Sequence, residues 1–511
     1  MRRINAPVSS LSLRSCPCCS VFPLTRWAFF LHCIVALSEM SELPVVVLGH
    51  IFGFLSPRRV VLICRLVCGL WSRARAVWPS LELPPLEWQA AKVIGASEAS
   101  RIVEIKMTCT QEIQGDFSLL LSGLPRLERL SLPHSDEINL LEACPGLQAV
   151  RITEQRTALC QNLPEVQVQA LRLQKWHFTT RDLQLNHVSQ RLHTLELVGC
   201  NIEDRDLRIL ATQLPNLTCL AMTDCGHNLT DSGLLHLTGL RLRVLRVKSQ
   251  WITDAALASL PRTLRELSFD ALHVTDAGIE SLRFLDLASL EFYSYFKTTS
   301  LHVLDDFAAL RSLTIKRRGY SQIIDPTRLL PPLKRLLNLE KLCVFSGTCV
   351  APELRLHHLE CDHVTHQQLE CIASLKTLSV LRVGNCRELS ADSFALFAQL
   401  DRLQSLALSW YHCLTDDCLR WLSMQSLESI EFNYCPQFTG TGIRHLQKLP
   451  RLFKVMIACC SLCNAGIARI CELPWLSALD LQESRTRGNS VTSVGRHILA
   501  EWSARRNQFL D

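Results

Sequence analysis

Histidine and cysteine, which are common zinc ligands in proteins, gather in one short stretch of this sequence. The stretch contains His357, His358, Cys361, His363, His366 and Cys371. Leucines at 356 and 359 belong to a spaced apolar pattern that recurs along the chain. That pattern puts Cys361 on the buried face of a short extended segment and His358 on the opposite face. Side chains on opposite faces do not converge on one ion, so we expect neither a metal site nor a cofactor here.

A second candidate for chemistry is the pair Cys460 and Cys463, which has C-x-x-C spacing. The pair stands alone, and Cys460 falls on a buried position of the same apolar pattern, where free cysteine acts as a small hydrophobe. The sequence has no G-x-x-x-x-G-K-[ST] phosphate loop, no G-x-G-x-x-G motif and no G-x-S-x-G elbow. We therefore expect that the chain is not an enzyme.

The apolar pattern is L-x-x-L-x-L, and it recurs about every 25 residues. Its best copies begin at Leu192, Leu217, Leu242, Leu264, Leu378, Leu403, Leu427, Leu452 and Leu476. Weaker copies begin at Ile102, Leu127, Leu147, Val168, Leu287, Leu310, Leu339 and Leu356. An insertion that includes Pro326, Pro331 and Pro332 interrupts the series.

Each copy predicts a short strand, because its fourth and sixth positions lie two residues apart and face the same way. The next inward position is often cysteine, at Cys200, Cys225, Cys386, Cys435 and Cys460. A T-D-x-G-L-like stretch follows, as in residues 230–234, where Thr or Asp can cap a helix. Helical spacing, as in residues 442–446, completes a unit of strand, turn and helix that needs its neighbours to bury its apolar face.

These residues resemble the cysteine-containing subclass of leucine-rich repeats, over roughly residues 100–484. The resemblance implies an α/β fold, a right-handed horseshoe solenoid with its parallel sheet on the concave side. We place the solenoid at residues 89–484 and a C-terminal cap or tail at residues 485–511.

A different pattern precedes the repeats. Leu48, Ile51, Phe52 and Leu55 share one helical face, Pro57 begins a second helix, and apolar spacing continues to Trp78. This segment resembles an F-box, with L-P, I-F-x-x-L, a proline turn and L-V-C-x-x-W in order. It departs from the family at residues 45–47, which are valines where acidic residues are usual, and at Gly49 within the first helix. We assign residues 40–88 to a small all-α F-box-like module.

The combined resemblance, to F-box/leucine-rich-repeat proteins, implies a substrate receptor of a Skp–cullin–F-box ubiquitin ligase. It implies a Skp-type adaptor and a cullin scaffold as partners, and a protein substrate on the concave face of the repeats. The implied adaptor-binding residues are Leu43, Pro44, Leu48, Ile51, Phe52, Leu55, Pro57, Val67 and Trp71. The alternative is a leucine-rich-repeat interaction scaffold whose helical segment is only a cap and which meets no ligase.

The composition of the chain bears on its partners and on its cellular compartment. Its 54 basic and 48 acidic residues give a net charge of +6 with no basic stripe, so we expect no nucleic-acid partner. Its 24 cysteines, many at one repeat position, favour a reducing compartment, the cytoplasm or the nucleus.

Residues 1–39 contain arginines and no acid before Glu39, and we interpret them as a disordered or targeting-like extension. A mitochondrial presequence, a signal peptide and translation from Met40 remain alternatives. The apolar run in residues 27–37 is shorter than the ~20 residues of a membrane span, so no membrane association is expected.

We place substrate recognition on the C-terminal half of the concave face, at Arg382, Trp410, Glu431, Tyr434 and Lys454. The copies from 378 onward are the most regular, and a rigid platform lowers the ordering cost of binding. Large aromatic residues are common hot spots of protein interfaces. The alternative for Trp410 is that it packs against a neighbouring loop.

The F-box-like pattern generates a direct test. Replacing Pro44 and Phe52 together by alanine should abolish adaptor recovery in a pull-down, because loss of one well-packed anchor costs about 2 kcal/mol or more. The repeats should stay folded, as judged by unchanged circular dichroism. Undiminished adaptor recovery would rule out the F-box role.

Overall fold

The computed structural model describes part of the chain, and all structural statements below concern that part. It comprises residues 80–83, 104–107, 126–134, 146–154, 168–175, 191–225, 228–294, 302–317, 333–344, 350–473, 476–482 and 497–502. The chain divides into two units, Met1–Glu128 and Arg129–Asp511, and each is described by itself. None of the described helices is long and apolar enough to cross a membrane.

Several sequence predictions fall outside the described residues. These are the extension at residues 1–39, the proline-rich insertion around residues 326–332 and all nine adaptor-binding residues, Leu43, Pro44, Leu48, Ile51, Phe52, Leu55, Pro57, Val67 and Trp71. They stay predictions.

The first unit contains two described strands, β1 (Ser80–Leu83) and β2 (Glu104–Met107). They pair in parallel, with Leu81 opposite Ile105. Strand β1 lies at the end of the range that we assigned to the helical module. Parallel pairing of strands has therefore begun by residue 80.

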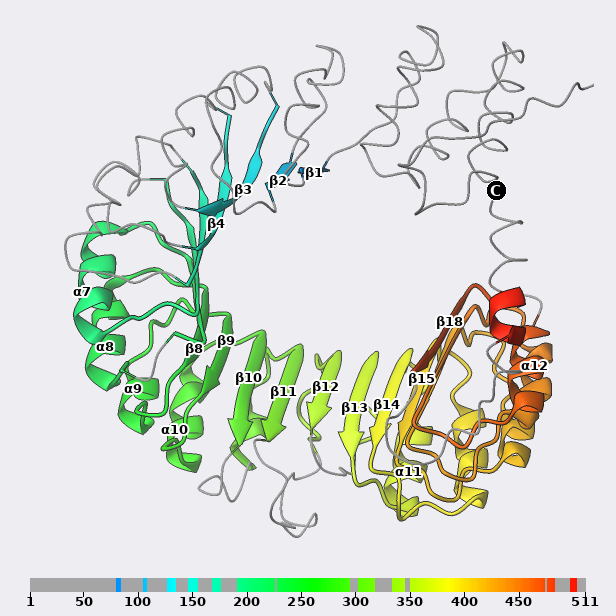
Figure 1. Cartoon of the computed structure of the whole chain (residues 1–511). Helices are drawn as coiled ribbons and strands as arrows, with labels where there is room; N and C mark the ends of the chain where they lie inside the picture. Colours follow the sequence, from blue (N-terminus) through cyan, green and yellow to red (C-terminus); the bar gives the residue numbers. More distant parts are fainter. Residues whose placement is uncertain are drawn as a thin grey trace, which may run out of the picture. The chain divides into compact units, whose positions relative to one another are not determined.

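The second unit is a continuous run of parallel strands, in which strands that follow one another in sequence are hydrogen-bonded (Figure 1). The strands are β3 (Arg129–His134), β4 (Ala149–Glu154), β5 (Ala170–Gln174), β6 (Thr194–Val198), β7 (Cys219–Thr223), β8 (Val244–Lys248), β9 (Glu266–Asp270), β10 (Ser289–Ser294), β11 (Ser312–Arg317), β12 (Lys341–Val344), β13 (His358–Asp362), β14 (Val380–Gly384), β15 (Ser405–Ser409), β16 (Ser429–Asn433), β17 (Lys454–Ala458) and β18 (Ala478–Gln482).

The pairing register joins equivalent repeat positions. Leu195 of β6 lies opposite Leu220 of β7, which lies opposite Leu245 of β8. These inward leucines are at most 1% exposed, so the predicted apolar pattern is confirmed as the core. At the last described strand, β18, Leu479 and Leu481 are only half-buried, because no described strand follows to cover them. The second unit is thus an α/β leucine-rich-repeat solenoid, as the sequence predicts.

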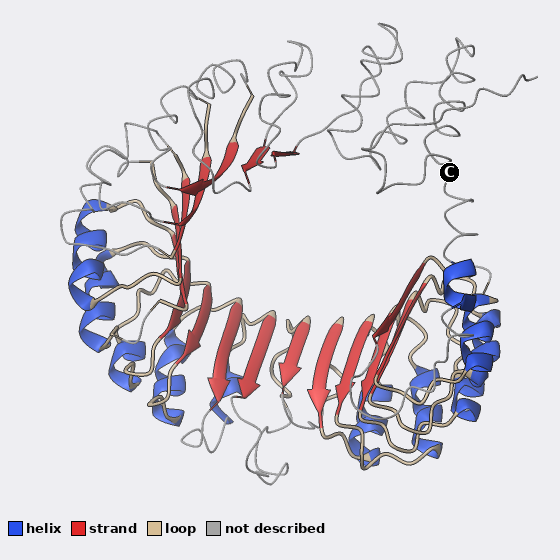
Figure 2. Cartoon of the chain, viewed as in Figure 1, coloured by secondary structure: helices blue, strands red, loops and turns tan. Residues whose placement is uncertain are grey.

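Helices follow many of the strands and lie on the outer side of the curved array, with the strands on its inner side (Figure 2). The α-helices are α7 (Asp204–Gln213), α8 (Asp231–Leu235), α9 (Asp254–Ala258), α10 (Asp276–Ser281), α11 (His366–Ala373) and α12 (Asn464–Cys471). The 3₁₀ helices are η3 (His236–Gly239), η4 (Leu282–Phe284), η5 (His302–Asp306), η7 (Asp392–Gln399), η8 (Asp416–Trp421) and η9 (Thr441–Lys448). Residues 442–446, predicted as helical, belong to a 3₁₀ helix.

The T-D-x-G stretches join neighbouring helices. Thr253 is the N-cap of α9, and its hydroxyl oxygen accepts a hydrogen bond from the Ala255 N–H, as predicted for a cap. The Thr253 N–H and hydroxyl both donate to the carboxylate of Asp231 in the preceding repeat, at 2.8 and 2.6 Å. The aspartate of this stretch therefore caps no helix of its own but holds the threonine of the next repeat. We call this arrangement the Asp–Thr clamp.

The clamp recurs in other repeats. Asp204 accepts from Thr230, and Asp254 accepts from Thr275, through the same pair of donors. In the C-terminal repeats the carboxylate of Asp416 accepts from the Thr439 N–H and hydroxyl and also from the Gly442 N–H.

Glycine is required beside this last clamp. A Cβ at Gly442 would lie 2.1 Å from the Asp416 carbonyl oxygen, which is far inside van der Waals contact. The G of the motif thus allows one repeat to approach the backbone of the repeat before it.

The inward cysteines occupy the turn after the strands. Cys200, Cys225, Cys386, Cys435 and Cys460 are at most 2% exposed, which confirms the predicted burial, and each carries a free thiol. Their sulfurs contact backbone carbonyl oxygens; the Cys225 Sγ donates to Leu197 O at 3.1 Å. Burial raises the pKa of Cys386 to about 12. A hydrogen bond with Cys200, with burial, raises the pKa of Cys225 well above its usual range.

The Asp–Thr clamp predicts a matched pair of stability effects. Asp416→Asn should lower the free energy of unfolding by about 1–3 kcal/mol, because an amide N–H₂ would face hydrogen-bond donors that lose their acceptor. The adjacent, exposed Asp417 is the control, and Asp417→Asn should change stability by less than about 0.5 kcal/mol. Urea unfolding followed by circular dichroism measures both. If both substitutions lowered the free energy of unfolding equally, the Asp–Thr clamp would not stabilise the fold.

The buried cysteines predict a reactivity pattern. The thiolate is the form that alkylates, and at pH 8 a thiol with a pKa of about 12 is ionised in about one molecule in ten thousand. Brief iodoacetamide treatment of the native protein should leave Cys386 and the other four inward cysteines unmodified, because all five are at most 2% exposed. The half-buried Cys413 and Cys459 serve as accessible comparators. Rapid labelling of the inward five, measured by peptide mass spectrometry, would contradict the repeat register.

Candidate functional site

The register of the strands arranges the outward side chains in rows across the inner face of the sheet. The fifth repeat positions form one row, which runs Thr314, Cys343, Glu360, Arg382, Ala407, Glu431, Met456 and Asp480. The third positions form another, which runs Ser312, Lys341, His358, Val380, Ser405, Ser429, Lys454 and Ala478. Every predicted strand residue of the recognition surface lies in one of these two rows.

Arg382 and Glu431 form an ion pair across two strand spacings. The Arg382 guanidinium lies 3.9 Å from the Glu431 carboxylate, and the side chains are 48% and 20% exposed. The residue between them in the row is Ala407, whose small side chain lets the arginine reach over β15. The Asn433 side-chain amide donates to Glu431 at 2.7 Å. Glu431 is thus held in place from two sides, although an exposed ion pair contributes little stability.

On its other side Arg382 lies opposite Glu360. The neighbouring His358 side chain, and then the charge of Arg382, lower the pKa of the Glu360 carboxyl. Glu360 is therefore ionised at neutral pH, and the row alternates negative, positive and negative charge.

Trp410 and Tyr434 form an aromatic stack at the end of their strands. Their rings are parallel within 1°, with centroids 4.2 Å apart. The Arg387 guanidinium lies 4.9 Å from the Trp410 ring centroid, a distance at which a cation is attracted to an aromatic face. Trp410 is 37% and Tyr434 41% exposed. We call these three residues the Arg387–Trp410–Tyr434 stack.

The two aromatic residues have an unusual backbone conformation. Trp410 and Tyr434 directly follow β15 and β16 and have left-handed backbones, with φ of 59° and 54°. Gly199 and Asn385 have the same conformation directly after β6 and β14, so the turn belongs to the repeat. It is costly for large residues and cheap for glycine and asparagine. The turn therefore does not account for tryptophan and tyrosine at these two positions.

The predicted recognition residues thus fall into smaller groups. The structure pairs Arg382 with Glu431 and stacks Trp410 on Tyr434. Lys454 begins β17 in the third-position row, beside Ser429 and Ala478, and joins neither group. Trp410 stacks on an exposed aromatic partner, Tyr434, from the next repeat. The sequence interpretation missed Arg387, whose contact with Trp410 spans two repeats.

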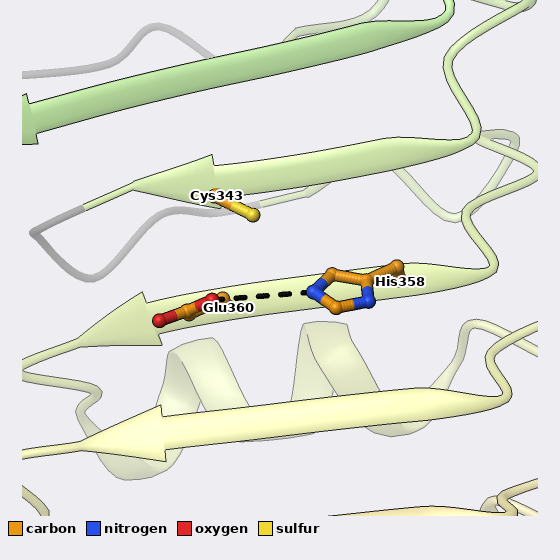
Figure 3. Close-up of side chains that lie close together, drawn as sticks. All are labelled: Cys343, His358 and Glu360. Atoms are coloured by element: carbon orange, nitrogen blue, oxygen red, sulfur yellow. Dashed lines mark ion pairs between the residues drawn. The ribbon is translucent and has the colours of Figure 1, made fainter. Parts of the chain in front are cut away.

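The histidine and cysteine stretch separates as predicted. Cys361 is fully buried, whereas His358 is half-buried on the inner face of the sheet. His358 instead lies near Cys343 and Glu360, and donor atoms of all three side chains lie within 4.8 Å of one another (Figure 3). Cys343 and Glu360 were missed, although aligning the repeats puts both at the fifth position of neighbouring copies. Burial raises the pKa of the Cys343 thiol.

No family model and no curated protein sequence matches this chain. Among solved structures it is similar to an internalin from Listeria monocytogenes, with a TM-score of 0.40 and 19% identity over 58% of this chain and 82% of that one. It is also similar to the complex of Rad7 and Elc1 in yeast, with a TM-score of 0.39 and 15% identity over 85% and 98%. A leucine-rich-repeat protein of Leptospira interrogans gives a TM-score of 0.35 and 17% identity over 79% and 95%. The leucine-rich-repeat fold of this chain rests on its own register and burial, not on these distant likenesses.

Proposed function

We propose that this chain is a substrate receptor of a Skp–cullin–F-box ubiquitin ligase. The segment at residues 43–78 would bind the Skp-type adaptor, and the cullin scaffold would follow through that adaptor. The inner face of the C-terminal repeats would hold the protein substrate. Ubiquitin transfer would belong to other subunits, and this chain would supply proximity.

The observation that carries the substrate half of the proposal is the Arg387–Trp410–Tyr434 stack. Tryptophan, tyrosine and arginine are the residues most enriched among interface hot spots. Here they are partly exposed and already held by one another, so little side-chain freedom remains to be lost on binding. Hydrogen bonds to the next repeat hold the backbones of the two aromatic residues in place. The Trp410 N–H donates to Asn433 O at 2.8 Å, and the Tyr434 N–H donates to Ala458 O at 3.0 Å.

The charge pattern favours a protein over a nucleic acid. Glu360, Arg382 and Glu431 alternate in sign along one row. A phosphate polymer is bound through clustered positive charge, whereas alternating charges fix the register of a protein partner. A protein ligand that presents its own alternating charges beside an apolar anchor would fit this surface.

The adaptor half rests on the F-box-like sequence of residues 43–78. The setting that goes with it is the cytoplasm or the nucleus, where free thiols persist. Recovery of adaptor and cullin with the wild-type chain distinguishes this receptor from a scaffold that meets no ligase. Adaptor and cullin recovery does not depend on the Arg387–Trp410–Tyr434 stack, so it tests the adaptor half of the proposal by itself.

The stack generates the test of substrate binding. Replacing Trp410 and Tyr434 together by alanine should weaken substrate capture by about 30-fold or more, because truncation of a hot spot costs about 2 kcal/mol or more. Quantitative affinity purification with mass spectrometry measures the change, with the adaptor as internal standard. The adaptor signal should not change.

Trp421→Ala is the matched control. Trp421 is 45% exposed and belongs to η8, among the outer helices rather than at the sheet. Its replacement should leave both partners bound. Equal substrate recovery with wild type and the double variant would place the substrate site elsewhere.

A further inference from the structure

Three side chains of metal-ligand type meet on the inner face of the sheet, in two adjacent strands. Cys343 belongs to β12, and His358 and Glu360 belong to β13. Cys343 and Glu360 face each other in the register, and His358 lies two residues before Glu360 on the same face. Figure 3 shows the Cys343 sulfur pointing toward β13, over which the His358 imidazole and the Glu360 side chain lie.

We propose that Cys343, His358 and Glu360 bind a zinc ion. Their sulfur, nitrogen and oxygen donors all lie within 4.8 Å of one another. Metal–ligand bonds of about 2.0–2.3 Å put the ligands of a tetrahedral zinc about 3.3–3.8 Å apart, so the donor atoms would need to approach one another by about 1 Å. Small side-chain rotations would therefore assemble the site without moving the strands.

The donor set selects zinc over the hard cations. Calcium and magnesium take six or more oxygen ligands, and this group offers a single carboxylate. A thiolate, an imidazole and a carboxylate are all ordinary zinc ligands, and three protein ligands leave the fourth tetrahedral position open. That position would face the inner side of the sheet, where water or a side chain of a bound protein could occupy it.

An unsatisfied atom supports the same assignment. The His358 Nε2 is buried and has no hydrogen-bond partner within the part of the chain that the structure describes. Its nearest anionic neighbour is the Glu360 carboxylate at 4.0 Å, which is beyond hydrogen-bond length. Buried polar atoms without a partner are uncommon and costly. A zinc ion between His358 and Glu360 would satisfy the nitrogen.

The neighbours of the three ligands in the register are two small residues and two cationic ones. Thr314 lies beside Cys343 and Val380 beside His358, and Lys341 of β12 lies opposite His358. Arg382 lies beside Glu360, and its ion pair with Glu431 draws its charge toward β16. Among the described residues, no other group of three such side chains comes as close together.

Cobalt binding to the full-length, untagged, chelator-treated protein tests the proposal. Cobalt(II) is the probe because a thiolate ligand produces an intense charge-transfer absorption that zinc does not. We expect this absorption to saturate at one cobalt per chain and to disappear on addition of zinc. Cys343→Ser should abolish it. His358→Gln should weaken cobalt affinity about 10-fold or more, since loss of even an outer partner of a zinc ligand costs that much.

Two control variants separate this site from other thiols and imidazoles. Cys219→Ser removes a half-buried cysteine that starts β7 at a third repeat position. His357→Gln removes the exposed histidine next to His358. Both should bind cobalt like wild type, and all four variants should unfold at the wild-type urea midpoint without metal. A charge-transfer band that survives Cys343→Ser, or cobalt affinity unchanged by His358→Gln, would overturn the assignment.

Discussion

In-register parallel pairing between neighbouring strands is the interaction on which the rest of the molecule depends. A single repeat has one short strand and a few leucines, so it can satisfy neither its backbone groups nor its apolar face. Pairing with the next repeat does both at once. From β3 to β18 the fourth and sixth positions always meet their own equivalents. The rows of outward side chains are therefore a consequence of the register, and so is every surface group described above.

The Asp–Thr clamp supplies a second set of contacts between repeats, on the side of the helices. In the clamps of α8, α9 and α10 the carboxylate at the start of one helix accepts from the N-cap threonine of the next. In the Asp416 clamp the donor is Thr439, which directly precedes the N-cap of η9. The carboxylate also lies at the positive end of its own helix, which favours its negative charge. Strand pairing thus fixes the inner edge of each repeat, and the clamp fixes the distance between successive helix starts. Together they make the inner face a rigid platform.

The sequence allowed much of the fold to be predicted, because period and burial are local properties. L-x-x-L-x-L placed strands such as β6 and β15 correctly, and it identified the buried cysteines, including Cys200 and Cys435. The clamp could not be predicted in this way, because Asp231 and Thr253 were each interpreted as a cap within one repeat. The Arg387 contact with Trp410 and the Cys343 contact with Glu360 also cross between repeats. Such contacts emerge only when the copies are aligned and the register is known.

The left-handed residue that directly follows several of the strands has a consequence for the evolution of this surface. At Gly199 and Asn385 the chain uses residues that accept this backbone at little cost. At Trp410 and Tyr434 it uses residues that do not. Selection for thermal stability alone would therefore drive positions 410 and 434 toward glycine or asparagine and dismantle the aromatic surface. Their side chains lie outside both the core and the clamp, so these positions can be exchanged without disturbing either. The same two residues offer a route by which the solenoid can change what it recognises while keeping its fold.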